Sequence, residues 1–311
     1  MLAAEAHDLV KTFDGKTAVD GVSIAVPAGS ISGILGPNGA GKTTTIRMML
    51  GIIDPDSGTR RLLGHDRPLE AAHEVGYLPE ERGLYPSMPA LEAMAFMGAL
   101  RGLPLAEGRR RGRAVLEENG HADWAARTIR SLSKGQAQTV QIYGSLLHRP
   151  KLIVLDEPFS GLDAINQEKL EALIRRQRDQ GVTVIFSTHV IAHAERLCDR
   201  VAIIAGGRVA FDGRVAEARE TLRPIVTLRT RSTDGPWRAA LPAEARANGN
   251  EWKFELPESG PEPLLRALLD GGAGIETLSI ERPGLHDAFI AIAGESAARE
   301  MGGAEPGRQA A

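Results

Sequence analysis

The stretch Gly36-Pro37-Asn38-Gly39-Ala40-Gly41-Lys42-Thr43 decides the fold, because it satisfies the pattern G-x-x-x-x-G-K-[ST]. The apolar run Ile31–Leu35 before it predicts a buried strand. The residues after it predict a helix, with Ile46, Met49 and Leu50 at helical spacing. Strand, loop and helix in this order are the context that identifies a phosphate-binding loop.

The residue types in this loop suit phosphate chemistry. Glycines let the backbone curl until successive N–H groups converge on phosphate oxygens, and the following helix directs its positive end at the same charge. We expect Lys42 to reach the β and γ phosphates of a nucleotide and Thr43 to hold Mg²⁺ through its hydroxyl. A glycine-rich turn before a helix is the plain alternative, but it does not explain Lys42 and Thr43 together.

A second acidic element lies further along the chain. The apolar run from Lys151 to Leu155 predicts a strand that ends in Asp156 and Glu157, so both carboxylates belong to the edge of a parallel sheet where ligands bind. We expect Asp156 to hold Mg²⁺, directly or through water, and Glu157 to orient or deprotonate the attacking water. Acids commonly end strands, so this pattern has weight only beside the phosphate loop.

Composition and charge exclude several classes of protein. The 311 residues carry 37 Lys plus Arg against 40 Asp plus Glu, a formal charge of −3 that argues against a strongly basic nucleic-acid binder. With 42% hydrophobic and 25% charged residues, the chain is not disordered as a whole. The single Cys198 forms no intramolecular disulfide or cysteine zinc cage and fits a reducing cytosol. Glu5, His7 and Asp8 interrupt any export signal, and the longest apolar patch is far shorter than the roughly 20 residues of a spanning helix.

The order of patterns along the chain predicts two domains and a tail. Short alternating strands up to Leu35 lead into the phosphate loop, a helical insert follows at about 89–148, and strands then alternate with helices as in a parallel sheet. These elements form one α/β domain, 1–218. Strands and two helices at 219–294 predict a small α+β domain, and 295–311 predict a disordered tail.

A family can be named from the segment Leu132-Ser133-Lys134-Gly135-Gln136. The chain resembles the nucleotide-binding subunits of ABC transporters, whose signature Leu-Ser-Gly-Gly-Gln this segment copies with Lys134 in place of the first glycine. Over about residues 3–215 the other elements of the family follow in order: Phe13, Gly76-Tyr77-Leu78-Pro79-Glu80, Ser160-Gly161-Leu162-Asp163 and Ser187-Thr188-His189. The resemblance implies a P-loop NTPase cassette, with a RecA-like core and antiparallel β and helical subdomains, plus the small C-terminal α+β domain.

The resemblance also assigns roles to residues. It implies that Phe13 stacks on adenine, although a Phe at this place is otherwise a core residue. It implies that His189 contacts the γ-phosphate and acts in catalysis with Glu157 and Lys42. Ser133, Gly135 and Gln136 would bind the nucleotide of a second copy, and Asp163 would lie across the dimer seam. The implied nucleotide-binding residues are Phe13, Gly36, Pro37, Asn38, Gly39, Ala40, Gly41, Lys42, Thr43, Thr44, Glu80, Ser133, Gly135, Gln136 and Asp163, and the implied Mg²⁺ ligands are Thr43, Asp156 and Glu80.

Several residues depart from the family pattern or permit another interpretation. Glu80 stands where the family usually has Gln, and its carboxylate can coordinate metal but repels phosphate. Lys134 can favour the phosphate of the second copy or point to solvent. The basic run Arg109-Arg110-Arg111 with Arg113 can face lipid headgroups or a membrane subunit, or form a solvated face. His189 and His193 have the i, i+4 spacing of a zinc pair, but Val190 follows His189 where a zinc protease has Glu, so we expect no zinc.

The expected function is an ATP-binding and ATP-hydrolysing subunit of an ABC transporter. Separate transmembrane subunits, a homodimer of cassettes and a place at the cytoplasmic face of the membrane follow from the resemblance, and the segment PEERGLY, 79–85, favours an exporter. A soluble ATPase switch on ribosomes or DNA is the alternative, against which stand the single phosphate loop, the absent coiled coil and the charge of −3. A module that binds ATP without turnover is a further alternative, and the retained Lys42, Asp156, Glu157 and His189 argue against it.

Overall fold

The structure is a computed structural model that describes residues 1–81 and 83–294. The chain divides into two units, Met1–Arg214 and Val215–Ala291, and the few described residues after Ala291 group with the first unit. The tail expected at 295–311 lies outside the described residues.

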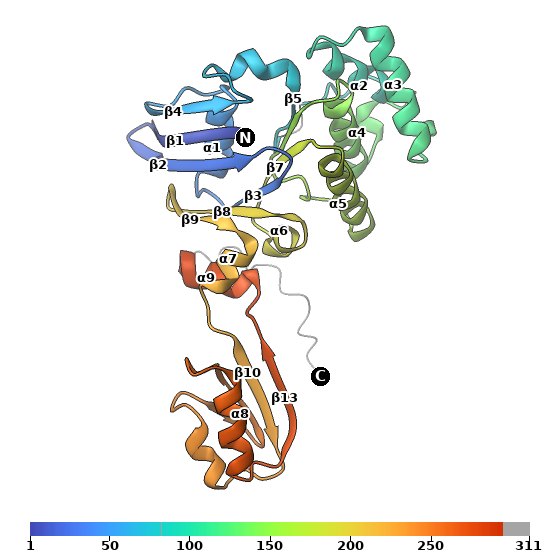
Figure 1. Cartoon of the computed structure of the whole chain (residues 1–311). Helices are drawn as coiled ribbons and strands as arrows, with labels where there is room; N and C mark the ends of the chain where they lie inside the picture. Colours follow the sequence, from blue (N-terminus) through green and yellow to red (C-terminus); the bar gives the residue numbers. More distant parts are fainter. Residues whose placement is uncertain (82, 295–311) are drawn as a thin grey trace. The chain divides into compact units, whose positions relative to one another are not determined.

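A six-stranded sheet runs through the first unit (Figure 1). Five neighbouring strands are parallel, and the last strand pairs antiparallel at the edge. The three central strands that lead to the candidate site are entirely buried and mostly apolar, as expected for a parallel sheet covered on both faces. In spatial order the strands are β5 (Val75–Leu78), β6 (Leu152–Leu155), β7 (Thr183–Thr188), β3 (Ile31–Leu35), β8 (Arg200–Ala205) and β9 (Arg208–Arg214).

A three-stranded antiparallel sheet precedes the phosphate loop. Its order is β2 (Lys16–Pro27), β1 (Leu2–Phe13) and β4 (Ser57–Leu62). Asp14 and Gly15 join β1 to β2 with φ angles of 47° and 78°, the left-handed pair that a tight two-residue hairpin requires. The Asp14-Gly15 pair between two alternating strands is a local turn signal for this hairpin, whereas nothing in the sequence of β4 marks it as a strand.

Helices cover the two faces of the six-stranded sheet with different partners. α1 (Lys42–Met49) packs Ile46 and Met48 into a core that joins this sheet to the three-stranded one. On the opposite face, α5 (Ala164–Asp179) and α6 (Ile191–Leu197) pack against Phe186 of β7. Successive residues of β6 point to opposite cores, Val154 to the first and Ile153 to the second.

A helical part lies between β5 and β6 in the sequence and has a core of its own. α2 (Ala90–Ala99) packs against α3 (Leu105–Glu118) and α4 (Lys134–Leu146), with Met94 and Leu116 fully buried between them. Short 3-10 turns complete the connections of the first unit. They are η1 (Pro68–Glu74), η2 (Ala122–Trp124) and η3 (Ile129–Ser131).

The parallel strands bring the predicted site residues to one edge. β6, β7 and β3 are neighbours and all run in the same direction, so their carboxyl ends meet. The phosphate loop follows β3, Asp156 follows β6 and His189 follows β7. This edge is where ligands bind in open α/β sheets.

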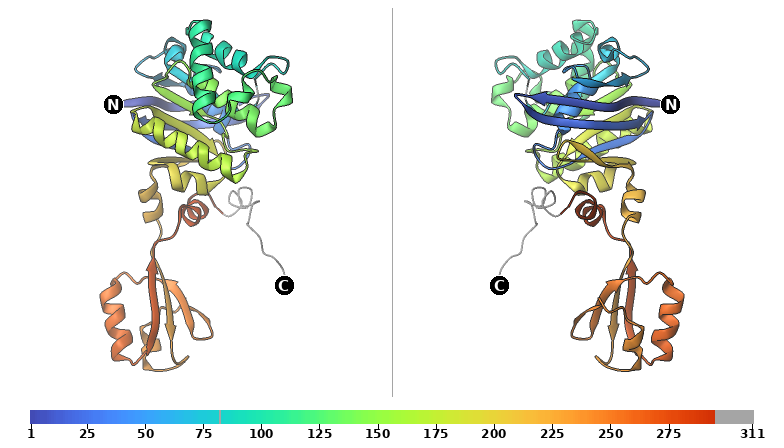
Figure 2. Two further views of the ribbon diagram at one scale, coloured as in Figure 1. Left: turned by 90° about the vertical axis from the view of Figure 1, so that its right-hand side faces the viewer. Right: turned by 90° about the vertical axis from the view of Figure 1, so that its left-hand side faces the viewer.

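The second unit is a four-stranded antiparallel sheet with a helix on one face (Figure 2). Its order is β11 (Arg246–Asn248), β12 (Glu251–Glu255), β10 (Ile225–Thr230) and β13 (Ile275–Glu281). α8 (Pro261–Asp270) packs on the core that contains Trp237 and Trp252. The remaining elements are α7 (Val215–Glu220), η4 (Pro236–Ala240) and α9 (Leu285–Ala293). Across the part of the chain that the structure describes, no helix is long and apolar enough to span a membrane.

Candidate nucleotide site

The phosphate loop is shaped by glycines that have no room for a side chain. A Cβ on Gly36 would lie 2.3 Å from the carbonyl oxygen of Ile204. A Cβ on Gly41 would lie 2.5 Å from the carbonyl oxygen of Ala18, and Gly41 has a φ of 101°. Gly41 directly precedes the first residue of α1, so the loop ends where free N–H groups of the helix begin.

The side chain of Lys42 folds back onto the first residues of the phosphate loop. Its side chain is only 6% exposed, and its Nζ donates to the carbonyl oxygens of Gly36 at 2.8 Å and Pro37 at 3.1 Å. The same Nζ lies 3.5 Å from Oε1 of Glu157. The ammonium group therefore lies between the phosphate loop and the acid after β6.

Asp156 is the buried acid of the site and has one oxygen free. Its Oδ1 accepts hydrogen bonds from Ser187 Oγ at 2.5 Å and from Thr43 Oγ1 at 3.2 Å. Its Oδ2 is buried without a hydrogen-bond partner among the described residues. Burial raises the pKa of Asp156, because a buried carboxylate is poorly solvated, while the hydrogen bonds from Ser187 and Thr43 oppose the shift. A cation beside Oδ2 would relieve this cost.

Glu157 is held in a strained backbone conformation. Its φ is 48°, in the left-handed region that residues other than glycine rarely adopt. Its N–H donates to Ser187 Oγ at 2.9 Å, and its Oε2 accepts a hydrogen bond from Nδ1 of His189 at 2.9 Å. Its Oε1 faces Lys42 and has no hydrogen-bond partner among the residues described. The strand end, the serine and the histidine together fix where this carboxylate points.

A cavity of about 640 Å³ opens beside the loop and collects half of the predicted residues. Phe13 lies at its wall with 42% of its surface exposed, and Lys11 Nζ lies 5.6 Å from its ring. Glu80 and Glu157 also line the cavity, whereas Gly36, Pro37, Ala40, Asp156 and His189 are absent from its lining. The lining is Phe13, Lys16, Thr17, Ala18, Asn38, Gly39, Gly41, Lys42, Thr43, Thr44, Glu80, Glu157, Gly206 and Gly207.

The predicted residues of the signature segment lie elsewhere. Ser133 caps α4, since Gln136 N–H donates to Ser133 Oγ at 3.2 Å and Ser133 N–H donates to Gln136 Oε1 at 3.0 Å. Asp163 caps α5 by accepting from the N–H of Asn166 at 2.8 Å. Ser133, Gly135, Gln136 and Asp163 do not line the cavity of their own chain.

The two histidines of the i, i+4 pair have separate partners. His189 bonds Glu157, whereas His193 is buried, stacks on Phe159 with ring centroids 4.0 Å apart and has its Nδ1 3.0 Å from Glu171 Oε1. Within residues 1–81 and 83–294 no group of three or more His, Cys, Asp and Glu side chains could hold a metal ion. A metal at Asp156 would therefore take part of its ligands from hydroxyls, water or the phosphates of a substrate.

Some residues of the site were missed in the sequence. Ser187 belongs to the Ser187-Thr188-His189 motif, which gives this serine no role of its own, yet its hydroxyl joins Asp156 to the backbone of Glu157. Its signal is a hydroxyl at the end of a buried strand next to two acids. Lys16, Gly206 and Gly207 line the cavity from the hairpin after β1 and the turn after β8, and no local pattern predicts them.

Comparison with known proteins gives relatives along nearly the whole chain. A family model described as ABC transporter matches residues 19–160. The chain is 33% identical over 287 residues to the Bacillus subtilis protein named "Uncharacterized ABC transporter ATP-binding protein YhaQ", covering 91% of this chain and 95% of the relative. It is 32% identical to the daunorubicin/doxorubicin resistance ATP-binding protein DrrA of Streptomyces peucetius, covering 95% of this chain and 93% of the relative.

Solved structures agree with these relatives. A structure described as the ATP binding subunit of an ABC transporter superposes with a TM-score of 0.65 and 31% identity. The match covers 71% of this chain and 93% of that one.

Proposed function

The chain belongs to the ATP-binding subunits of ABC transporters, which hydrolyse ATP to power transport, and from this membership we propose the role of each site residue and the partners of the chain. The membership confirms the resemblance that the sequence shows and the α/β P-loop fold that it implies. The roles rest on the geometry of the cavity beside β3.

The cavity binds ATP with its phosphates on the loop at 36–43 and its adenine on Phe13. Backbone N–H groups at the start of α1 and the ammonium group of Lys42 face the phosphates. Lys42 exchanges its hydrogen bonds to Gly36 and Pro37 for phosphate oxygens. The half-exposed ring of Phe13 offers an apolar face on which a base can stack.

Thr43 and Asp156 suit a magnesium ion that accompanies the phosphates. The free Oδ2 of Asp156 and the nearby Thr43 hydroxyl are the hard oxygen ligands that Mg²⁺ prefers, and Glu80 at the cavity wall can add a further oxygen. Such an ion supplies positive charge to the β and γ phosphates. Asp156 stays oriented for this role by its hydrogen bond from Ser187.

Glu157 acts on the attacking water, and its geometry is the single observation that carries the proposed reaction. The water oxygen attacks the γ-phosphorus, the bond from that phosphorus to the β–γ bridging oxygen breaks, and a proton of the water passes to the Glu157 carboxylate. ADP leaves with the electron pair of the broken bond. His189 holds Glu157 through Nδ1, and a second proton on Nε2 would let the imidazolium ring also donate to the γ-phosphate.

A second cassette completes each site. Ser133 and Asp163 are exposed at the beginnings of α4 and α5, and Ser133, Gly135 and Gln136 are absent from the cavity of their own chain. Helix N-termini attract anions, so the segment at 133–136 suits the γ-phosphate bound by another copy. Two copies of this chain, each with a complete set of motifs, form the proposed homodimer.

ATP hydrolysis by this chain drives separate transmembrane subunits. Binding to those subunits places the chain at the membrane as a peripheral subunit. Export is the proposed direction, because a relative along nearly the full length is named a daunorubicin/doxorubicin resistance ATP-binding protein. The cargo of this chain is not carried over from that relative.

The variant Glu157→Gln tests the proposed reaction. It keeps the size of the side chain but removes the proton acceptor, so ATP binding persists and steady-state hydrolysis falls by about 100-fold or more. Glu168→Gln is the matched control, because Glu168 lies on the exposed face of α5 outside the cavity. Equal hydrolysis by wild type and Glu157→Gln would overturn the role of Glu157.

A further inference from the structure

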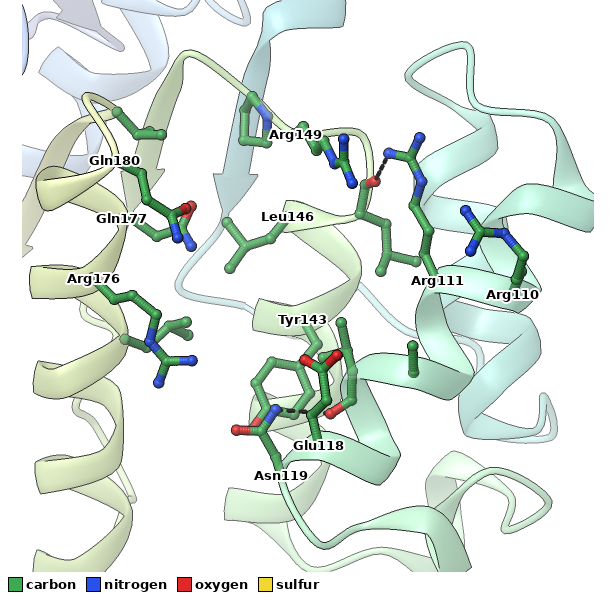
Figure 3. Close-up of a pocket in the computed structure, with 16 residues that line it drawn as sticks. Arg110, Arg111, Glu118, Asn119, Tyr143, Leu146, Arg149, Arg176, Gln177 and Gln180 are labelled. Atoms are coloured by element: carbon green, nitrogen blue, oxygen red, sulfur yellow. Dashed lines mark hydrogen bonds between the residues drawn. The ribbon is translucent and has the colours of Figure 1, made fainter.

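A second cavity of about 730 Å³ lies in the first unit and shares no residue with the nucleotide cavity. It is bounded by α3, the end of α4, the link from α4 to β6, and α5 (Figure 3). Leu146, Leu173 and Val182 give it apolar walls. The function proposed above uses none of its lining residues.

Arginines dominate the charge of this cavity. Arg110, Arg111, Arg149 and Arg176 line it against a single carboxylate, that of Glu118. Figure 3 shows that these arginines come from three separate places in the chain, α3, the α4–β6 link and α5. The lining therefore carries more positive than negative charge, which favours an anion.

Two of the four arginines already have hydrogen-bond partners. Arg110 and Arg111 both donate to Glu107, at 2.7 Å and 2.6 Å, and Arg111 also donates to the carbonyl oxygen of Leu147 at 2.8 Å. Arg149 and Arg176 form no side-chain hydrogen bond or ion pair with the residues that the structure describes. Their guanidinium forks are the available donors of the cavity.

The backbone of Arg149 adds an independent observation. Its φ is 58°, and its N–H donates to the carbonyl oxygen of Leu146 at 2.9 Å in the turn that leaves α4. Glycine adopts this conformation freely, whereas an arginine there costs on the order of 1 kcal/mol. The turn therefore holds an arginine at a position where glycine would be more stable, and its unpaired side chain enters the cavity.

Neutral donors accompany the two free arginines. Gln177 and Gln180 supply amides and Tyr143 supplies a hydroxyl, whereas the amide nitrogen of Asn119 already donates to the carbonyl oxygen of Val115. Burial raises the pKa of Tyr143, against a smaller opposite effect from the charge of Arg176, so the hydroxyl keeps its proton at neutral pH. Such a set can donate to several oxygens of one anion.

We propose that this cavity binds a phosphate-bearing anion, with Arg149 and Arg176 as its charged donors. Two planar guanidinium forks and a hydroxyl suit the several oxygens of a phosphate dianion better than the two oxygens of one carboxylate. The phosphate belongs to a small soluble molecule or to a lipid headgroup, and the chemistry at the arginines is the same for both. This binding is independent of ATP hydrolysis.

Equilibrium dialysis with radiolabelled pyrophosphate, up to about 1 mM, counts the soluble anion sites. Wild type binds two pyrophosphates per chain, one on the phosphate loop and one in this cavity, and Arg149→Gln/Arg176→Gln binds one. Arg113→Gln is the matched control, since Arg113 is an exposed arginine of α3 outside the cavity, and it binds two. These three stoichiometries together would show that a soluble phosphate compound occupies the cavity.

Sedimentation with phosphatidylcholine vesicles, with and without phosphatidic acid, tests the headgroup as the source. A headgroup ligand makes wild type and Arg113→Gln sediment with the acidic vesicles about ten-fold more than the double variant. The proposal is overturned if neither pyrophosphate nor acidic vesicles distinguish the double variant from Arg113→Gln.

Arg149→Gly separates ligand binding from a structural role. Glycine relieves the left-handed backbone, so the variant unfolds at an equal or higher temperature than wild type and loses the same anion binding as the double variant. A lower unfolding temperature together with full anion binding would show that Arg149 serves the turn and would refute its role as a donor.

Discussion

Ser187 joins the two acids of the site at the scale of a single residue. One hydroxyl donates to Asp156 and accepts the backbone N–H of Glu157, so it couples the proposed metal ligand to the proposed general base. The left-handed backbone of Glu157 is held partly by this contact. Removing the hydroxyl frees both acids while leaving every proposed nucleotide contact in place.

Ser187→Ala is expected to lower kcat by about 10- to 100-fold with ATP affinity within a few fold of wild type. The buried Glu157 N–H loses its partner, which also costs about 1–3 kcal/mol of stability. Ser145→Ala is the control, because it removes a buried serine hydroxyl of α4 outside the cavity. Steady-state ATPase rates and ATP titrations measure both quantities, and an unchanged kcat would contradict the role of Ser187.

Phe13 is the test of base stacking. Base stacking on an aromatic ring is worth about 1–3 kcal/mol, so Phe13→Ala weakens ATP binding by about ten-fold, whereas Phe13→Tyr keeps it. Calorimetric titration with ATP compares the three proteins. If Phe13→Ala bound ATP with an affinity within two-fold of wild type, Phe13 would have no role in stacking on the base and would only form the end of the hairpin.

At the scale of elements, His148 ties the end of α4 to the start of β5. Its Nε2 donates a hydrogen bond to the carbonyl oxygen of Val75 at 3.1 Å, and its buried Nδ1 has no hydrogen-bond partner among the described residues. Burial lowers the pKa of His148 from 6.5 to about 4. The folded protein therefore favours the neutral ring.

The sign of the resulting pH dependence follows from this lowered pKa. The contribution of His148 to stability is fully present above pH 6.5 and is lost as the pH falls from 6.5 towards 4, because the unfolded chain takes up the proton first. The loss amounts to about 1–2 kcal/mol once partial solvent access is allowed for. His148→Gln keeps a donor for Val75 but does not titrate, so its unfolding free energy falls less over this range.

Urea unfolding at several pH values between 6.5 and 4 measures this difference. The exposed His286→Gln is the control and follows wild type. If the difference in unfolding free energy between wild type and His148→Gln stayed constant over this pH range, His148 would not be the group responsible for the loss of stability.

The sequence predicts elements that carry their own pattern of turn residues or apolar spacing. It misses elements that form only because residues far along the chain lie beside them. The hairpin at Asp14-Gly15 and the unit of β3, phosphate loop and α1 each carry their own pattern of turn residues or apolar spacing. β4 reads SGTRRL and has no apolar alternation, and it is a strand because it pairs with β1. Ser187 and Gly207 likewise belong to the site through neighbours in space, which a linear pattern does not contain.

At the scale of the whole molecule, the described chain holds half of each proposed reaction site. The loop at 36–43 and Glu157 face its own cavity, whereas the signature segment at 133–136 lies outside that cavity. A site assembled from two chains makes ATP itself part of the interface, so nucleotide binding and dimerisation become one equilibrium. Slow hydrolysis then holds the dimer together, and fast hydrolysis releases it.

The mass of Glu157→Gln in solution, measured by light scattering with and without Mg²⁺ and ATP, tests this account most directly. The account predicts one chain without nucleotide or with ADP, two chains with ATP, and one chain with ATP when Ser133→Arg is added to block the second half of the site. A protein that is saturated with ATP and Mg²⁺ and still has the mass of a single chain would contradict it.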